Sequence, residues 1–181
     1  MPDVLGGSKQ GNPKGVSVAL ASTLVVQKTV ALLSGDTGLP ATAREIALMS
    51  GVTLPTITAQ QVIAQNVAAD VVGKSSSLNY PVFCVYCERL TNSHLERFRV
   101  FSGEVSAAVE VRVSQDRVDG LEDQLHGCVD AVTQALDENG GEWGDGVFYA
   151  GGYEVTYSPV KHGGRNFLQS AKVTFIVALS R

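Results

Sequence analysis

The strongest constraint on the fold is an alternation of apolar and polar residues between positions 103 and 114, interrupted only at Ala108. Alternate side chains of a β-strand point to opposite faces of a sheet. The pattern therefore predicts one long strand over residues 97–114, with an apolar face for the core and a polar face outside it. We expect Gly103 to mark a bulge or a kink in this strand. The apolar positions are Val105, Ala107, Val109, Val111 and Val113.

Three other segments predict partners for this strand. Residues 80–88 are apolar at both alternating sets of positions, which is typical of a central strand covered on both faces. Residues 153–157 and 171–179 alternate and predict two more strands, joined by a loop over residues 159–170. Between the two strand pairs, apolar residues three or four apart predict an amphipathic helix over residues 116–138.

The part of the chain before the Gly- and Ser-rich connector at residues 73–77 has no aromatic residue and is mostly helical in pattern. Glycines in the first fifteen residues indicate a flexible arm. Helices are predicted over residues 18–33, 40–50 and 58–72, the last on the capping-box spacing of Thr58 and Gln61. All of these elements together predict an α+β fold, an antiparallel four-stranded sheet with helices packed on one face.

Composition narrows the class of protein. The chain has 181 residues, of which 44% are hydrophobic and 18% charged, with a formal net charge of −4. This excludes intrinsic disorder and disfavours nucleic-acid binding by bulk positive charge. So high an apolar content with so few charges suggests that other subunits cover part of the surface.

Cysteine usage and hydropathy bear on the compartment. Three cysteines do not make a disulfide framework, so we expect synthesis in a reducing cytoplasm. The apolar run at residues 16–26 is too short for a membrane span and ends at Gln27 and Lys28. We therefore expect a buried helix or strand there rather than a signal peptide, and no membrane association.

The residue types that usually carry catalysis are not arranged for it. Cys84 and Cys87 form a C-x-x-C spacing inside a strand pattern, which places the two thiols on opposite faces. Gly73-Lys74-Ser75 lacks the earlier glycine of a phosphate-binding loop. The histidines are too scattered for a metal pair or a catalytic triad, and they are His94, His126 and His162. We expect no catalytic residue, no metal and no cofactor, and thus no enzyme.

A DNA-binding alternative rests on residues 42–72, which have the rhythm of a helix-turn-helix. The second helix would carry no Lys or Arg to contact phosphates, and it contains Asp70. Packing of one helix on another is the more economical interpretation.

Two segments are candidates for interaction. The helix over residues 116–138 has seven acidic residues and one basic residue, which gives either a solvated face or the lining of a channel that repels DNA. The 159–170 loop is longer than a hairpin needs, so it is either a mobile surface loop or a binding loop. Its candidate contact residues are Lys161, His162, Arg165, Phe167 and Leu168.

The order of elements in the last hundred residues resembles the tail terminator proteins of long-tailed bacteriophages. The matching features are the Tyr80–Tyr86 strand, the alternating Gly103–Val113 strand, the acidic helix over residues 119–136, and a closing hairpin of residues 153–157 with 171–175. The resemblance covers residues 56–181, so we expect an α+β domain there. Residues 1–55 would form an N-terminal arm and helical extension.

The resemblance implies a structural virion protein at the tail–head junction, assembled in the host cytoplasm. It would form a homohexameric ring that caps the tail tube protein, stops its polymerisation and presents a surface to a head–neck connector or stopper protein. The loop would contact the neighbouring ring. DNA would pass through the lumen without specific binding, facing Asp119, Glu122, Asp123 and Asp130. The alternatives are another neck, tail-completion or head–tail adaptor protein and, less favoured, the helix-turn-helix protein.

Overall fold

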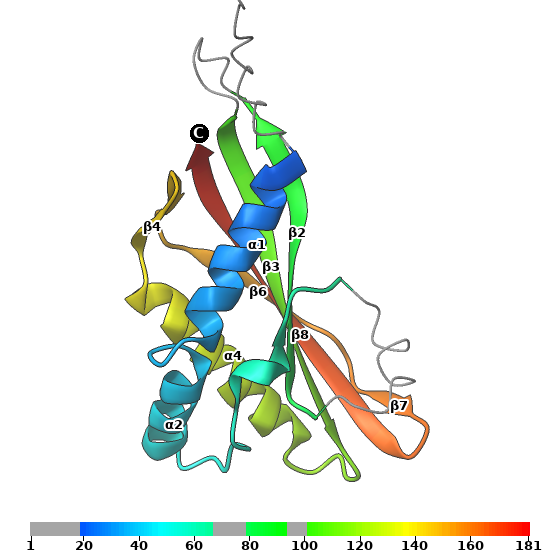
Figure 1. Ribbon diagram of the computed structural model, residues 1–181. Coiled ribbons are helices and arrows are strands. Elements are labelled where there is room, and N and C mark those ends of the chain that lie inside the picture. The colour runs from blue at the N-terminus through cyan, green and yellow to red at the C-terminus, as the bar shows by residue number, and fades with distance from the viewer. Residues whose placement is uncertain (1–18, 67–78, 94–100) are drawn as a thin grey trace, which may run out of the picture.

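Three long antiparallel strands form the middle of the sheet in the computed structural model, which describes residues 19–66, 79–93 and 101–181 (Figure 1). They are β2 (Val82–Asn92), β3 (Ser102–Gln115) and β8 (Asn166–Ser180). β3 pairs with β8 along its whole length. The long alternating strand predicted from the sequence is thus confirmed over residues 102–114. The arm at residues 1–15, the connector at 73–77 and His94 lie outside the described residues.

Short strands extend the sheet at both sides. The order is β1-β2-β3-β8-β5-β4, and β6 and β7 also pair with β8, which makes eight strands within the described residues. The α+β class is confirmed, but four antiparallel strands are too few and the sheet is mixed, because β1 runs parallel to β2. The short strands are β1 (Val62–Ile63), β4 (Gly141–Gly144), β5 (Val147–Tyr149), β6 (Tyr153–Tyr157) and β7 (Lys161–Gly163).

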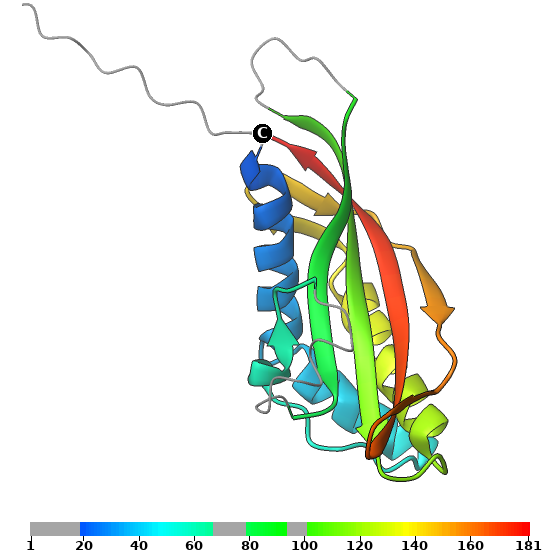
Figure 2. The same ribbon diagram turned by 90° about the vertical axis from the view of Figure 1, so that its right-hand side faces the viewer.

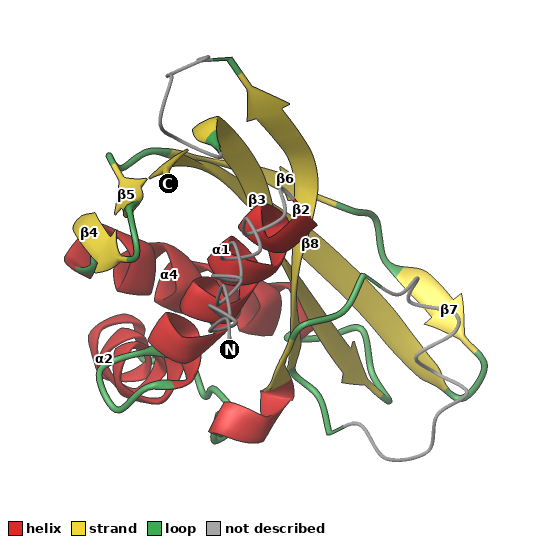
Figure 3. Ribbon diagram, turned by 45° about the horizontal axis from the view of Figure 1, so that its top comes forward, coloured by secondary structure: helices red, strands yellow, loops and turns green. Residues whose placement is uncertain are grey.

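Helices cover one face of the sheet, as expected. α1 (Ala19–Ser34) packs on β2 and β3, and α4 (Leu121–Glu138) packs on β3 and β8. α2 (Leu39–Ser50) packs against α4. Figure 3 shows the three helices gathered on one side of the long strands. Val25 and Leu33 of α1 belong to the same buried cluster as Val109 and Leu125, so the N-terminal helices share the core of the sheet.

An aromatic group closes the core at one end of α4. The ring of Trp143, on β4, lies 5.4 Å from that of Tyr149 and 6.2 Å from that of Phe175. Its indole N–H donates a 2.7 Å hydrogen bond to the carbonyl oxygen of Asn139, the residue that ends α4. The glycine-rich segment after α4 forms the β4–β5 hairpin, in which Gly141 pairs with Tyr149.

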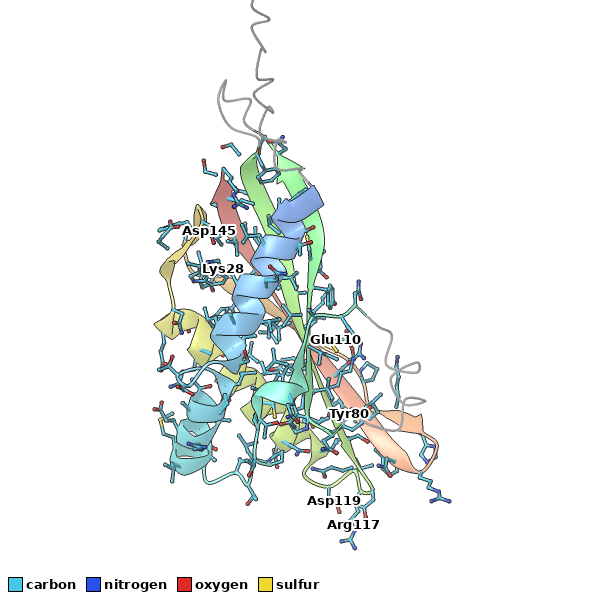
Figure 4. The ribbon with its side chains drawn as sticks, in the orientation of Figure 1. Lys28, Tyr80, Glu110, Arg117, Asp119 and Asp145 are labelled. Carbon is cyan, nitrogen blue, oxygen red and sulfur yellow. The ribbon has the colours of Figure 1, made fainter. Side chains whose placement is uncertain are left out.

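The helix predicted over residues 116–138 begins five residues later than expected. Gly120 has a φ of +79°, a left-handed conformation that cannot continue a helix, and α4 starts at Leu121. Val118 is exposed rather than on the apolar face, and Asp119 lies in the turn before the helix instead of on it. Figure 4 shows Arg117 and Asp119 beside each other at this end of the molecule.

The helix predicted over residues 58–72 is wrong across its described part. The Thr58–Gln61 capping box forms, but it begins a single 3₁₀ turn, η1 (Ala59–Gln61), followed by β1. The buried Gln61 side chain accepts a 2.6 Å hydrogen bond from the Thr58 N–H and donates a 2.9 Å bond to the Pro81 carbonyl oxygen. Because this bond holds Gln61 against the start of β2, the residues that follow Gln61 continue as the strand β1 and not as a helix. The helix-turn-helix alternative thus has no second helix over residues 56–66, and residues 67–72 lie outside the described ranges.

The loop predicted over residues 159–170 is also wrong. β7 pairs with the first residues of β8, Gly163 opposite Asn166, and Gly164 turns the chain with a φ of +89°. The segment is a tight hairpin because glycine readily adopts that left-handed conformation. The bulge expected at Gly103 lies instead on β2, between Cys87 and Arg89.

Candidate interaction surfaces

The first surface is the basic hairpin, made of β7, the turn at residues 164–165 and the start of β8. Lys161, His162 and Arg165 are exposed on it. The His162 ring packs edge-on against Phe167, with centroids 5.3 Å apart. Phe167 and Leu168 are half-buried, and Phe167 packs against the core. The five candidate residues therefore lie together on the hairpin. The three polar ones are exposed to solvent, and the two apolar ones are half-buried.

The second surface is the acidic face of α4, formed by the exposed Glu122, Asp123, Asp130 and Asp137. The three aspartates recur every seven residues, so they lie on one stripe of the helix, about 10.5 Å apart. Glu122, Asp123 and Asp130, expected on an acidic helix, are therefore on one exposed face, whereas Asp119 is not part of it.

One flank of the acidic face meets α2 and the other meets β6. On the first flank, the side-chain amide of Gln134 donates a 2.7 Å hydrogen bond to Glu45 of α2. On the second, the Tyr153 hydroxyl donates a 3.2 Å bond to Asp137, and the His126 ring contacts the Tyr157 ring at 5.0 Å. The acidic face consequently continues onto the last strand at that side of the sheet.

We define the β6–α4 surface as Tyr153 and Tyr157 of β6 with Asp123, His126, Asp130 and Asp137 of α4. The tyrosines are 40% and 45% exposed. Burial and the nearby charge of Asp130 raise the pKa of the Tyr157 hydroxyl. One edge of β6 pairs with β8, and no described strand pairs with its other edge, as the orange strand in Figure 2 shows. This surface combines aromatic rings, carboxylates and an open strand edge.

Among the described residues, no ion pair neutralises the charges of these surfaces. The pairs among the described residues are Lys28–Asp145 at 2.9 Å, seen in Figure 4, Arg112–Glu110 at 2.9 Å and Lys172–Glu88 at 2.8 Å. None of the three involves the basic hairpin or the acidic face. The sequence is also polarised, because residues 116–145 contain nine acids and one base, whereas residues 155–181 contain four bases and no acid.

A third surface lies on the side of the sheet away from the helices. Phe148 is opposite Ala178, and Ile176 is two residues along β8 on the same face. Phe148 and Ile176 are 46% and 48% exposed, and Ala178 is exposed too. We name these three residues the outer patch. Paired apolar side chains on an open sheet face are typical of a contact site.

The cysteines have the environment of packing residues. Cys84 is buried opposite Glu110, and Cys87 is half-buried opposite Ala107, on the other face of β2. Burial raises the pKa of both thiols, whereas a reactive thiol needs a lowered one. Cys128 is fully buried, and burial raises its pKa to about 12.

Compared with known proteins, the sequence matches no family model and no curated protein. Within residues 19–66, 79–93 and 101–181, no group of three or more His, Cys, Asp or Glu side chains could hold a metal ion. No helix in the same ranges is long and apolar enough to cross a membrane.

Two of the hollows in the described part of the chain are lined without acidic or histidine side chains. One, of about 100 Å³, lies between α2 and residues 54–57. The other, of about 340 Å³, lies between α1, the end of β1 and β2, and is lined by Gln27, Gln65, Tyr86 and Cys87 among others.

The contact roles of the two tyrosines of β6 and of the outer patch were not predicted from the sequence. Tyr153 and Tyr157 are four residues apart on a strand, so they share a face, and this signal was present in the sequence. Their nearness to Asp130 and Asp137 depends on how α4 crosses the sheet, which no local pattern contains.

Proposed function

We propose that this chain is a structural subunit that self-associates into a ring at the tail–head junction of a phage virion. In this role it caps the tail tube protein, stops tube polymerisation and joins the tail to a head–neck connector or stopper protein. It carries out no catalysis. The observation that carries the proposal is a well-packed core whose surface keeps three contact sites, the basic hairpin, the β6–α4 surface and the outer patch.

The exposed apolar side chains of these sites gain free energy when another protein covers them, whereas their charged groups are well solvated and contribute mainly to the choice and orientation of a partner. Single exposed apolar residues are common on monomers, but grouped ones beside an open strand edge mark an interaction site. The order of elements that resembles tail terminators supports a ring in particular. A ring subunit needs separate surfaces for its two ring neighbours and for the adjacent layers, and this chain has three separate surfaces, enough for both neighbours and one layer.

The partners divide among the surfaces. We assign the outer patch to the tube or the connector, because an apolar face suits a permanent contact with another protein. DNA passes through the lumen without base-specific binding, consistent with the net charge of −4. The acidic face has two candidate neighbours in such a ring, DNA in the lumen and a basic surface of the next subunit.

Mass measurement and microscopy test the proposal. Light scattering on the purified protein should give a species six times the 19.1 kDa subunit mass, and negative-stain images should show rings. In a phage that produces the protein, a tagged copy should label the head-proximal end of the tail, and loss of the protein should give tails of uncontrolled length.

Other results would overturn the proposal. A protein that stays monomeric at all concentrations and is missing from virions is not a ring component. Labelling of the neck without loss of length control would identify an adaptor instead. A stable dimer with salt-sensitive DNA affinity would support the DNA-binding alternative.

A further inference from the structure

We infer that the basic hairpin of one copy docks on the β6–α4 surface of the next copy. The inference rests on the proposed self-association and names the two surfaces that meet in it. The occupant is therefore a second copy of this chain, and the contact is between two different patches.

Charge complementarity is the first argument. Lys161 and Arg165 are exposed at the hairpin, and the described part of their own chain gives them no ion pair. Asp123, Asp130 and Asp137 form a stripe along the receiving side, also without an ion pair there. Complementary patches of this kind steer association and fix the register of the contact.

The chemistry of the receiving surface is the second argument. Tyr153 and Tyr157 stand half-exposed next to the carboxylates, and an exposed aromatic ring can bind a Lys or Arg cation over its face. The hairpin adds the exposed Val160 as an apolar contact. A wall that only repels DNA would need carboxylates alone, whereas exposed aromatic rings beside carboxylates suit a basic protein segment.

Backbone geometry is the third argument. The unpaired edge of β6 is five residues long and presents N–H and C=O groups beside the tyrosines. The hairpin is a tight, paired structure at the end of the long β8, so it docks as a preformed unit with little loss of chain entropy.

The symmetry of the contact connects it to a ring. The hairpin and the β6–α4 surface are different patches of one chain, so the contact is heterologous. A pair of copies therefore keeps a free hairpin at one end and a free β6–α4 surface at the other. Such contacts close into rings when the rotation between copies allows it.

Charge reversal on each side gives a direct test. The variants are K161E/R165E on the hairpin and D123K/D130K on α4. Asp137 is left unchanged because it accepts the hydrogen bond of Tyr153. Each variant alone sets like charges against each other, so its self-association should weaken at least about tenfold. Light scattering at low salt measures this, with circular dichroism to verify folding.

Mixing the two variants is the decisive arm. In an assembly where the two variants alternate, every contact is either the original charge pair or its reversed equivalent, so an equimolar mixture should assemble again. The chain carrying all four substitutions should also assemble by itself. Matched controls with the same charge change at exposed sites elsewhere, R44E/R89E and E104K/E142K, should assemble like the wild type.

The outcomes separate this inference from the proposed function. Wild-type rings with unchanged assembly of both reversed variants would overturn the docking contact and leave the ring intact. Weakened variants that fail to rescue each other would also overturn it. If D123K/D130K rings assemble normally but retain DNA, the acidic face lines the lumen. A wild type that never assembles would overturn both proposals.

Discussion

Gly103 is a residue whose role follows from the distance between two backbones. A Cβ atom built there would overlap the carbonyl oxygen of Thr91 on the neighbouring β2. Its φ is not in the left-handed region, so glycine is required for space and not for conformation. A bulge or a kink was expected at this glycine, and the bulge lies on β2 between Cys87 and Arg89 instead.

We expect Gly103→Ala to lower the free energy of unfolding by about 1–3 kcal/mol, because the clash is with backbone and cannot be relieved by a side-chain rotation. Urea unfolding measures the change. Gly140→Ala is the matched control, since a Cβ at Gly140 meets nothing within 4 Å. Equal stability of the two variants would contradict the close approach of β2 and β3.

The buried thiol of Cys128 should make the free energy of unfolding depend on pH in the alkaline range. Its pKa is raised by burial from the ordinary value of 9.0 to about 12. Between these values the unfolded thiol loses its proton while the folded thiol keeps it, so stability should fall as the pH rises above 9. The slope from one such group is at most about 1.4 kcal/mol per pH unit.

Urea unfolding of Cys128→Ala between pH 8 and 10.5 should therefore show a shallower decline than the wild type. A residual slope is expected because burial also raises the pKa of Tyr149 to about 12. Cys87→Ala, at a half-buried position, should keep a slope closer to that of the wild type. Parallel curves for wild type and Cys128→Ala would refute the assignment.

At the scale of elements, the periodicity of apolar residues predicted the helices and strands whose structure depends on their own local sequence. The alternation between Val105 and Val113 specified β3 because burial on one face fixes a strand's pattern. α1 and α2 were predicted nearly to the residue, the latter with Gly51 as its left-handed C-cap at a φ of +69°. The helix over residues 58–66 failed because the Gln61 side chain bonds to Pro81, twenty positions away. The prediction of a loop over residues 159–170 failed because the polar, glycine-rich sequence of this hairpin resembles that of a loop.

Gln61 anchors the connection between η1 and β2, so Gln61→Ala should lower the free energy of unfolding by about 1–3 kcal/mol. The Pro81 carbonyl oxygen would then lose its partner in a buried place, and the part-buried Thr58 N–H would lose its acceptor. Gln60→Ala provides the comparison, because Gln60 is the exposed neighbour in the same turn. Chemical denaturation of both variants measures the difference, and similar midpoints would show that the anchor contributes nothing.

For the whole molecule, the distribution of charge could be predicted from the sequence and the contact sites only in part. The acidic block and the acid-free C-terminal strand are visible in the residue order. That α4 brings Asp130 beside Tyr157 depends on tertiary packing, as does the exposure of Ile176 within an alternating strand. The residue order of a strand is the same whether its outer face lies in water or contacts another protein, so the sequence alone does not identify the contact.

The outer patch should contribute to assembly and not to folding. The double variant F148S/I176S removes two exposed apolar side chains, so its free energy of unfolding should stay within about 0.5 kcal/mol of the wild type. Its incorporation at tail ends should fall, which a competition between tagged wild-type and variant protein in infected cells would measure. Equal incorporation would exclude this face as a contact with the tube or the connector.

The joint between β4 and α4 has a practical consequence, because Trp143 is the single tryptophan of the chain. Its indole N–H is hydrogen-bonded to the Asn139 carbonyl oxygen at the end of α4, and its ring packs against those of Tyr149 and Phe175. Light emitted on excitation at tryptophan wavelengths therefore comes from one known place. A red shift of that emission would report the β4–β5 hairpin leaving the helix, so the protein carries an intrinsic optical probe of its own integrity.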